Sequence, residues 1–153
     1  MHKSYENHFS SLLHSLSESM TRLATEINLH DGLVNRIIID QKEETIIFEL
    51  ICGDLQLGYS DVHLKYSSVD FDSLDFQNVA YIVRYRKTEL LYHEIDLDED
   101  KYYIHSFLFY PDGEFSIRFK QMELNQTSKP DRKRMHLGDP FQFCFGTLPD
   151  GSL

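Results

Sequence analysis

The chain has 153 residues, of which 41% are hydrophobic and 13% aromatic, so its composition indicates one globular domain rather than a disordered segment. Its formal net charge of -10 and pI of about 5.1 lack the basic footprint of a nucleic-acid-binding protein and disfavour contact with anionic lipid. Cys52 and Cys144 form no CxxC pair, and no apolar run has the length of a leader or a membrane span, so we expect a cytoplasmic protein.

The first predicted element is a long helix over residues 5–27. Its apolar residues recur at steps of three, four and one, which is a single stripe of a 3.6-residue period. Ser4 suits the N-cap position because its hydroxyl can accept a hydrogen bond from the first helical turn. A stripe of this kind must be buried, so we expect the helix to pack on one face of a sheet.

Residues 33–69 have the pattern of three strands. The segment NRIIIDQKEETIIFELICGD reads as two β-branched runs joined by a polar turn at residues 41–44. Apolar residues then alternate with polar ones, among them Asp61, His63 and Lys65, after the interruption at Gly53. These runs predict a three-strand meander with one protected face.

Residues 73–83 fit two elements. Asp72 or Ser73 suits the cap of a short helix that runs to about Tyr81, whereas the apolar run AYIVRY is also consistent with a buried strand. Of the two we predict the helix.

A second meander is predicted from residue 91 onward. The first strand ends in a turn at residues 98–101, and YYIHSFLFY, apolar on both faces, has the pattern of a central strand. Pro111 and Gly113 mark the next turn, because proline fixes its φ angle and glycine tolerates positive φ. The last strand begins near Phe115 and is expected to end near Leu124.

The predicted architecture is α+β: a mainly antiparallel sheet of about six strands in two meanders, with the long N-terminal helix packed on one face. Residues 1–124 form a single domain in this prediction. Residues 125–153 form a polar, basic tail, in which FQFCF at 141–145 is apolar enough to dock as a short extra strand.

The stretch HEIDLDED at residues 93–100 is the densest group of carboxylates. Its alternating aspartates have the D-x-D-x-D start of a calcium loop, but the positions that require Gly and Glu hold Lys101 and Phe107. We therefore predict a hairpin turn whose acids are solvated and contribute little to the fold.

No catalytic, metal or cofactor site is assigned from the sequence. His93-Glu94 begins the zinc motif H-E-x-x-H, but position 97 is leucine and the segment is a predicted strand. No glycine-rich phosphate loop and no G-x-S-x-G elbow occur. An alternative hypothesis keeps His63, His93 and His105 as a pocket or metal site of a small-ligand or metal-dependent enzyme on the open sheet face.

Two basic clusters are candidate nucleic-acid contacts: Arg84, Arg86 and Lys87, and then Lys129 with residues 132–134. A domain of this acidity lacks the continuous basic face that such binding needs, so solvated strand and tail ends are the favoured interpretation. No nucleic-acid or membrane partner is expected.

LYHEIDLDEDKYYIHSFLFYPDGEFSIRFKQMEL at residues 91–124, with GYSDVHLKYSSV at 58–69, resembles small uncharacterised bacterial α+β proteins. Some similar proteins are immunity-type partners of secreted toxins. The resemblance spans about residues 33–124 and implies a non-enzymatic protein-binding module, although no catalytic residue follows from it.

Residues 1–125 carry -11 and residues 126–153 carry +1, and solubility is the favoured interpretation of this acidity. If the charge serves a partner, that partner is expected to be a basic protein. The leading hypothesis is therefore an immunity-like inhibitor of a basic partner. The residues expected to contact that partner are Asp96, Asp98, Glu99 and Asp100.

Overall fold

The computed structural model describes residues 18–84, 87–133 and 141–144, and of the last segment it gives the backbone only. The elements in chain order are α2 (Glu18–Thr25), β1 (Leu33–Asp40), β2 (Thr45–Asp54), β3 (Gly58–Ser67), the short 3₁₀ helix η2 (Phe71–Ser73), α3 (Phe76–Arg84), β4 (Glu89–Leu97), β5 (Tyr103–Tyr110), β6 (Glu114–Phe119), β7 (Gln121–Lys129) and β8 (Phe141–Cys144).

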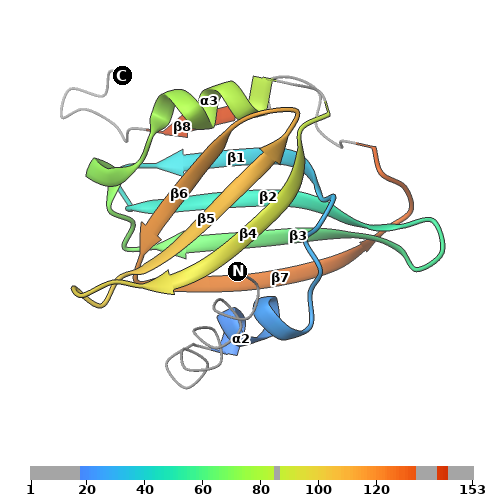
Figure 1. Cartoon of the computed structure of the whole chain (residues 1–153), viewed down its shortest axis with the longest axis horizontal. Helices are drawn as coiled ribbons and strands as arrows, with labels where there is room; N and C mark the ends of the chain where they lie inside the picture. The colour runs from blue at the N-terminus through green and yellow to red at the C-terminus, as the bar shows by residue number, and fades with distance from the viewer. Residues whose placement is uncertain (1–17, 85–86, 134–140, 145–153) are drawn as a thin grey trace.

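The strands form one curled sheet with the order β6-β5-β4-β1-β2-β3-β7. β1 and β4 are paired only where Leu33 lies opposite Glu89, and beyond that point they diverge. β8 pairs in parallel with the other end of β1, at residues 37–40. As a result, β4, β5 and β6 cross in front of β1, β2, β3 and β7 as a second layer (Figure 1).

The two ends of this strand order are joined through one residue, Lys120, which lies between β6 and β7. The sequence shifts phase at this point. The buried residues of β6 occupy odd positions, such as Phe119, whereas those at the start of β7 occupy even positions, Met122 and Leu124. This shift lets the chain leave β5 and pair β7 with β3.

Aromatic rings fill the space between the two layers. Phe48 of β2 lies 5.2 Å from Phe107, 6.2 Å from Phe109 and 5.8 Å from Phe115, measured between ring centroids. These three partners belong to β5 and β6, so Phe48 connects one layer to the other. All four rings are buried, and the core is built around them.

Each helix covers an open side of the curled sheet (Figure 1). α2 packs on β7, burying Met20 and Leu23, and the Ser19 hydroxyl accepts a hydrogen bond from the backbone N–H of Leu124 at 3.3 Å. α3 lies against β1, β6 and β8. It starts after Asp75, whose carboxylate accepts the N–H of Asn78.

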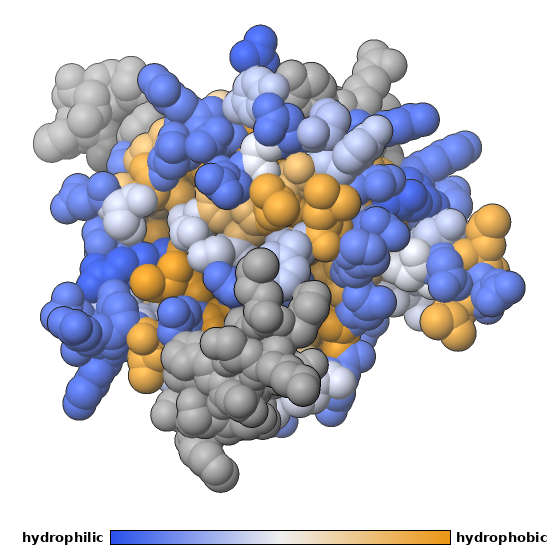
Figure 2. All heavy atoms as spheres, in the orientation of Figure 1, coloured by the Kyte–Doolittle hydropathy of each residue, from blue (hydrophilic) through white to orange (hydrophobic). Residues whose placement is uncertain are grey.

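The outer face of β4, β5 and β6 is turned toward the viewer in Figures 1 and 2. Hydrophilic residues cover most of it, with smaller hydrophobic areas between them (Figure 2). Neither α2 nor α3, the α-helices of the described ranges, has the length and apolar character needed to cross a bilayer.

The α+β class, the mostly antiparallel sheet and the first meander are confirmed. The strand number was wrong, since seven strands form the ordered path and β8 adds to it. Of the long helix predicted over residues 5–27, the structure describes the eight-residue α2. The part before residue 18, with Ser4, lies outside the described residues. Residues 73–83 contain a helix, α3, although it begins later than predicted.

The last predicted strand was also wrong in its bounds. The phase shift at Lys120 divides it into β6 and β7, and β7 continues past Leu124 to Lys129. Residues 125–129 therefore lie inside the sheet rather than in a polar tail. Their polar side chains are tolerated because this half of β7 presents most of them to solvent. β8 falls within residues 141–145, where a short docking strand was expected.

Candidate functional site

Three connections meet at one end of the molecule: the β1–β2 turn, the link from β3 to η2, and the β4–β5 turn (Figure 1). Backbone hydrogen bonds join the first connection to the second and the second to β6. The N–H of Val69 donates to the carbonyl of Glu44 at 2.9 Å, and the N–H of Asp70 donates to the carbonyl of Arg118 at 2.8 Å. Segments that are far apart in the sequence are thereby fixed side by side.

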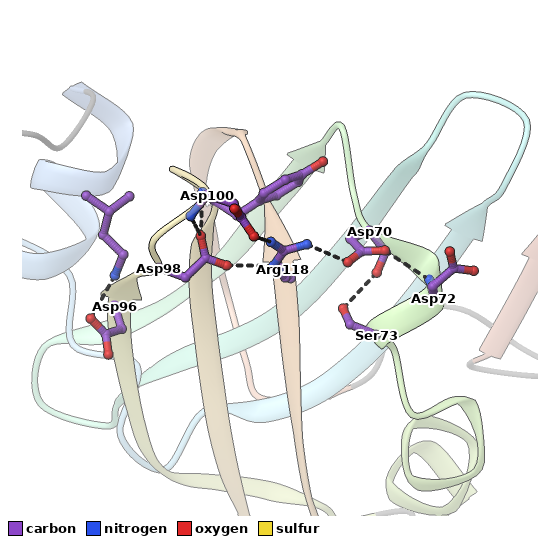
Figure 3. A network of polar contacts seen from close by, with 9 residues as sticks. Asp70, Asp72, Ser73, Asp96, Asp98, Asp100 and Arg118 are labelled. Carbon is purple, nitrogen blue, oxygen red and sulfur yellow. Dashed lines mark hydrogen bonds and ion pairs between the residues drawn. The ribbon is translucent and has the colours of Figure 1, made fainter.

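Arg118 of β6 lies at the centre of this end (Figure 3). Its guanidinium donates to Asp98 at 2.7 Å, to Asp70 at 2.6 Å and to Asp100 at 3.2 Å. The ring of Tyr102 lies 3.8 Å from the guanidinium carbon, a cation–π contact. One cation thus faces three carboxylates, which come from two separate connections.

Asp98 closes the β4–β5 turn. Its Oδ1 accepts the backbone N–H groups of Asp100 at 2.9 Å and Tyr102 at 3.0 Å. The hydrogen bond from Arg118 holds the pKa of the Asp98 carboxyl below its usual value and raises the pKa of Arg118. The turn itself matches the prediction, and Glu99 and Asp100 are exposed as expected. Asp98 differs, because Arg118, twenty residues later in the sequence, supplies a partner.

Asp98→Asn is expected to lower the melting temperature at pH 7 by more than Asp100→Asn, since the Asp98 side chain is 22% exposed and that of Asp100 is 79% exposed. A carboxyl whose folded pKa is depressed stabilises the fold above its unfolded pKa of about 3.9 and loses that contribution as the pH falls through the folded pKa. The gap between the two variants should therefore close in thermal melts near pH 2. Equal melting temperatures at pH 7 would contradict this role.

The three connections carry more carboxylates than Arg118 can neutralise. We define the acidic end by these eight acids: Asp40, Glu43, Glu44, Asp70, Asp72, Asp98, Glu99 and Asp100. The cations beside them are Lys42 and Lys101 on the connections, Arg118 of β6, and Lys120, whose ammonium lies 4.9 Å from the centroid of the Tyr102 ring. A depression of about 410 Å³ lies here, lined in part by Glu44, Asp70 and Asp72.

The four predicted partner-binding residues differ in their contacts. Asp98 and Asp100 contact Arg118, whereas Asp96 lies apart on β4, where its carboxylate accepts the N–H of Leu97 (Figure 3). Glu99 is exposed at the turn.

Of the three candidate histidines, the structure brings together His93 and His105. Nδ1 of His93 lies 3.0 Å from Nε2 of His105, and Nδ1 of His105 lies 2.8 Å from the hydroxyl of Tyr66. Burial lowers the pKa of His93 to about 4 and that of His105 well below its ordinary value, so both rings are neutral at pH 7. Tyr66 can then donate to His105 and His105 to His93, which makes this a hydrogen-bonded core chain.

His63 lies elsewhere, on the outer face of β3. It belongs to a row of polar side chains in register across four strands: Arg36 opposite Glu49, Glu49 opposite His63, and His63 opposite Asn125. These residues line a pocket of about 520 Å³ with Asp61 and Thr127, which we call the outer-face pocket. In the described part of the chain, no group of three His, Cys, Asp or Glu side chains is arranged to hold a metal ion.

Sequence reasoning missed Arg118 and most of the outer-face pocket. Glu49 and Asp61 could have been placed on one face of the first meander, since each falls in the polar phase of its alternation. Arg36 and Asn125 required the strand register, which local patterns do not give. No protein-family model, curated protein or solved structure matches this chain.

Proposed function

We propose that the chain is a non-enzymatic protein-binding module that takes a basic partner at its acidic end, in the manner of an immunity-type inhibitor. The observation that carries the proposal is the meeting of three sequence-distant connections with eight carboxylates against four cations. The resemblance of residues 33–124 to small bacterial α+β proteins, some of them immunity-type partners of secreted toxins, suggests the same class.

Arg118 divides these carboxylates into two kinds. Asp70 and Asp98 are hydrogen-bonded to it and hold the connections in place. Glu43, Asp72 and Glu99 are exposed. A surface built in this way presents fixed negative charge to a partner without first having to order its own loops, which lowers the cost of binding.

Charge reversal at the exposed acids tests the proposal. Glu43→Lys with Glu99→Lys changes the acidic end by four units without touching the Arg118 contacts. Because complementary charge speeds encounter and opposes dissociation, a partner's affinity should fall by at least tenfold and the remaining binding should lose its salt dependence. Proteins retained from the native host at low and high salt should be compared by mass spectrometry, and the affinity of each should be measured after purification.

The matched control is Glu26→Lys with Glu114→Lys, which changes the total charge equally at exposed positions outside the acidic end. A basic protein should bind the wild type and this control alike, and should be lost from the acidic-end variant. If no basic protein distinguishes the two variants, the proposal is wrong.

A further inference from the structure

The outer-face pocket lies on the opposite side of β1, β2, β3 and β7 from the aromatic core. Side chains alternate across a sheet, so Asp61 and His63 of β3 share one face while Val62 points into the core. Thr127 lies opposite Asp61 on β7. With about 520 Å³, the pocket has the size of a small-molecule site.

The wall of the pocket is held in place before any ligand binds. Arg36 donates twice to the carboxylate of Glu49, at 2.8 and 3.0 Å, and Nδ1 of His63 lies 3.3 Å from the same carboxylate. A break in the β1–β2 register falls between Val34 and Arg36, and bulges of this kind redirect side chains next to binding sites.

Asp61 is the carboxylate of the pocket whose charge is least compensated. Its Oδ1 is buried and accepts no hydrogen bond from any residue in the described ranges, and burial raises the pKa of the carboxyl. Lys129 attracts it only in part, because its ammonium is 3.2 Å from Asp131. The arginine of the pocket, Arg36, is occupied by Glu49.

We propose that the outer-face pocket binds a small organic cation, a diamine or polyamine, beside Asp61. An ammonium group supplies the positive charge that this partly desolvated carboxylate lacks, and its N–H groups can be shared with the side chains of Asn125 and Thr127. An anion is disfavoured because Glu49 already neutralises Arg36. The site lies on another face than the acidic end, so either can fail without the other.

Calorimetric titration with 1,4-diaminobutane at low salt tests the proposal. Asp61→Asn should raise the dissociation constant of the diamine at least tenfold, because it removes the charge of the side chain while keeping its shape. Asp72→Asn removes the same charge from the acidic end and should change the constant by less than twofold. The neutral analogue 1,4-butanediol should not bind. No heat from the wild type would show that the diamine does not bind and would overturn the site. Equal weakening by both variants would also overturn it, because the binding would then be general attraction by an acidic protein.

Two measurements keep the test independent of folding. Thr127→Val is a change of nearly equal volume at an exposed position, and it should weaken diamine binding about threefold without altering the melting temperature. Amide chemical shifts in the wild type should change most at residues 61–63 and 125–127 on adding the diamine. Shifts centred on residues 97–102 instead would contradict the proposal.

Discussion

Phe48→Ala is expected to lower the free energy of unfolding by about 3–5 kcal/mol, the usual cost of removing a fully buried phenylalanine ring. Phe48 is 0% exposed, and it contacts Phe107, Phe109 and Phe115 of the opposite layer. The substitution would leave a cavity between the two layers. Neither layer can move in to fill it without disturbing hydrogen bonds between strands. Urea denaturation at pH 7 measures the change.

Leu57→Ala is the control for this prediction. Leu57 is 89% exposed at the β2–β3 turn, so its truncation should change the free energy of unfolding by no more than about 0.5 kcal/mol. Phe48→Leu, which keeps much of the volume, should fall between the two. A loss below about 1 kcal/mol for Phe48→Ala would mean that the layers are not held together by this ring.

Mild acid is expected to destabilise the fold well before the carboxylates protonate. The pKa of His93 is lowered by burial to about 4, and burial lowers that of His105 well below its ordinary 6.5. Below pH 6.5 the unfolded chain takes up protons that the folded chain refuses, so stability falls with pH by about 1.4 kcal/mol per unit for each histidine. For His93 alone the loss between pH 6.5 and 4 is on the order of 3 kcal/mol.

Urea midpoints between pH 7.5 and 5 test this, because carboxylates remain ionised over that range. His93→Gln should reduce the slope of the free energy of unfolding against pH by about 1.4 kcal/mol per unit, which corresponds to one proton. His30→Gln, which removes a histidine whose side chain is 58% exposed, is the control for the loss of one histidine. An unchanged slope in His93→Gln would contradict this, because it would mean that the folded chain protonates the His93 ring as readily as the unfolded chain does.

Local sequence patterns were sufficient for the parts of the fold that depend on neighbouring residues. The first meander, the turn at Pro111 to Gly113 and the helix α3 follow from alternation, turn chemistry and helical spacing, which act over a few residues. The division of β6 from β7 is also visible as a phase shift at Lys120, and the prediction of one continuous strand there is wrong.

Long-range pairing decides the rest. The Arg118 contacts join β6 to connections up to 48 residues away, so no spacing in the sequence indicates them. The outer-face pocket depends on the register of four strands. A slip of one residue in β2 would turn Glu49 into the core, and only the completed sheet fixes that register. The polar sequence of β7 concealed its place in the sheet for the same reason.

The late position of β7, which follows β6 after Lys120, also affects folding during synthesis. Tyr59 of β3 pairs with Lys129 of β7, seventy residues later, so the outer edge of β3 lacks its complete strand partner until the chain is made through residue 129. At about 5–20 residues per second, a ribosome needs on the order of ten seconds to cover that distance. During this interval the β2–β3 hairpin presents unpaired backbone groups next to Val62, Leu64 and Tyr66. This nascent edge is the stage at which the chain is most open to pairing with another copy or to capture by a chaperone, and the arrival of β7 ends it.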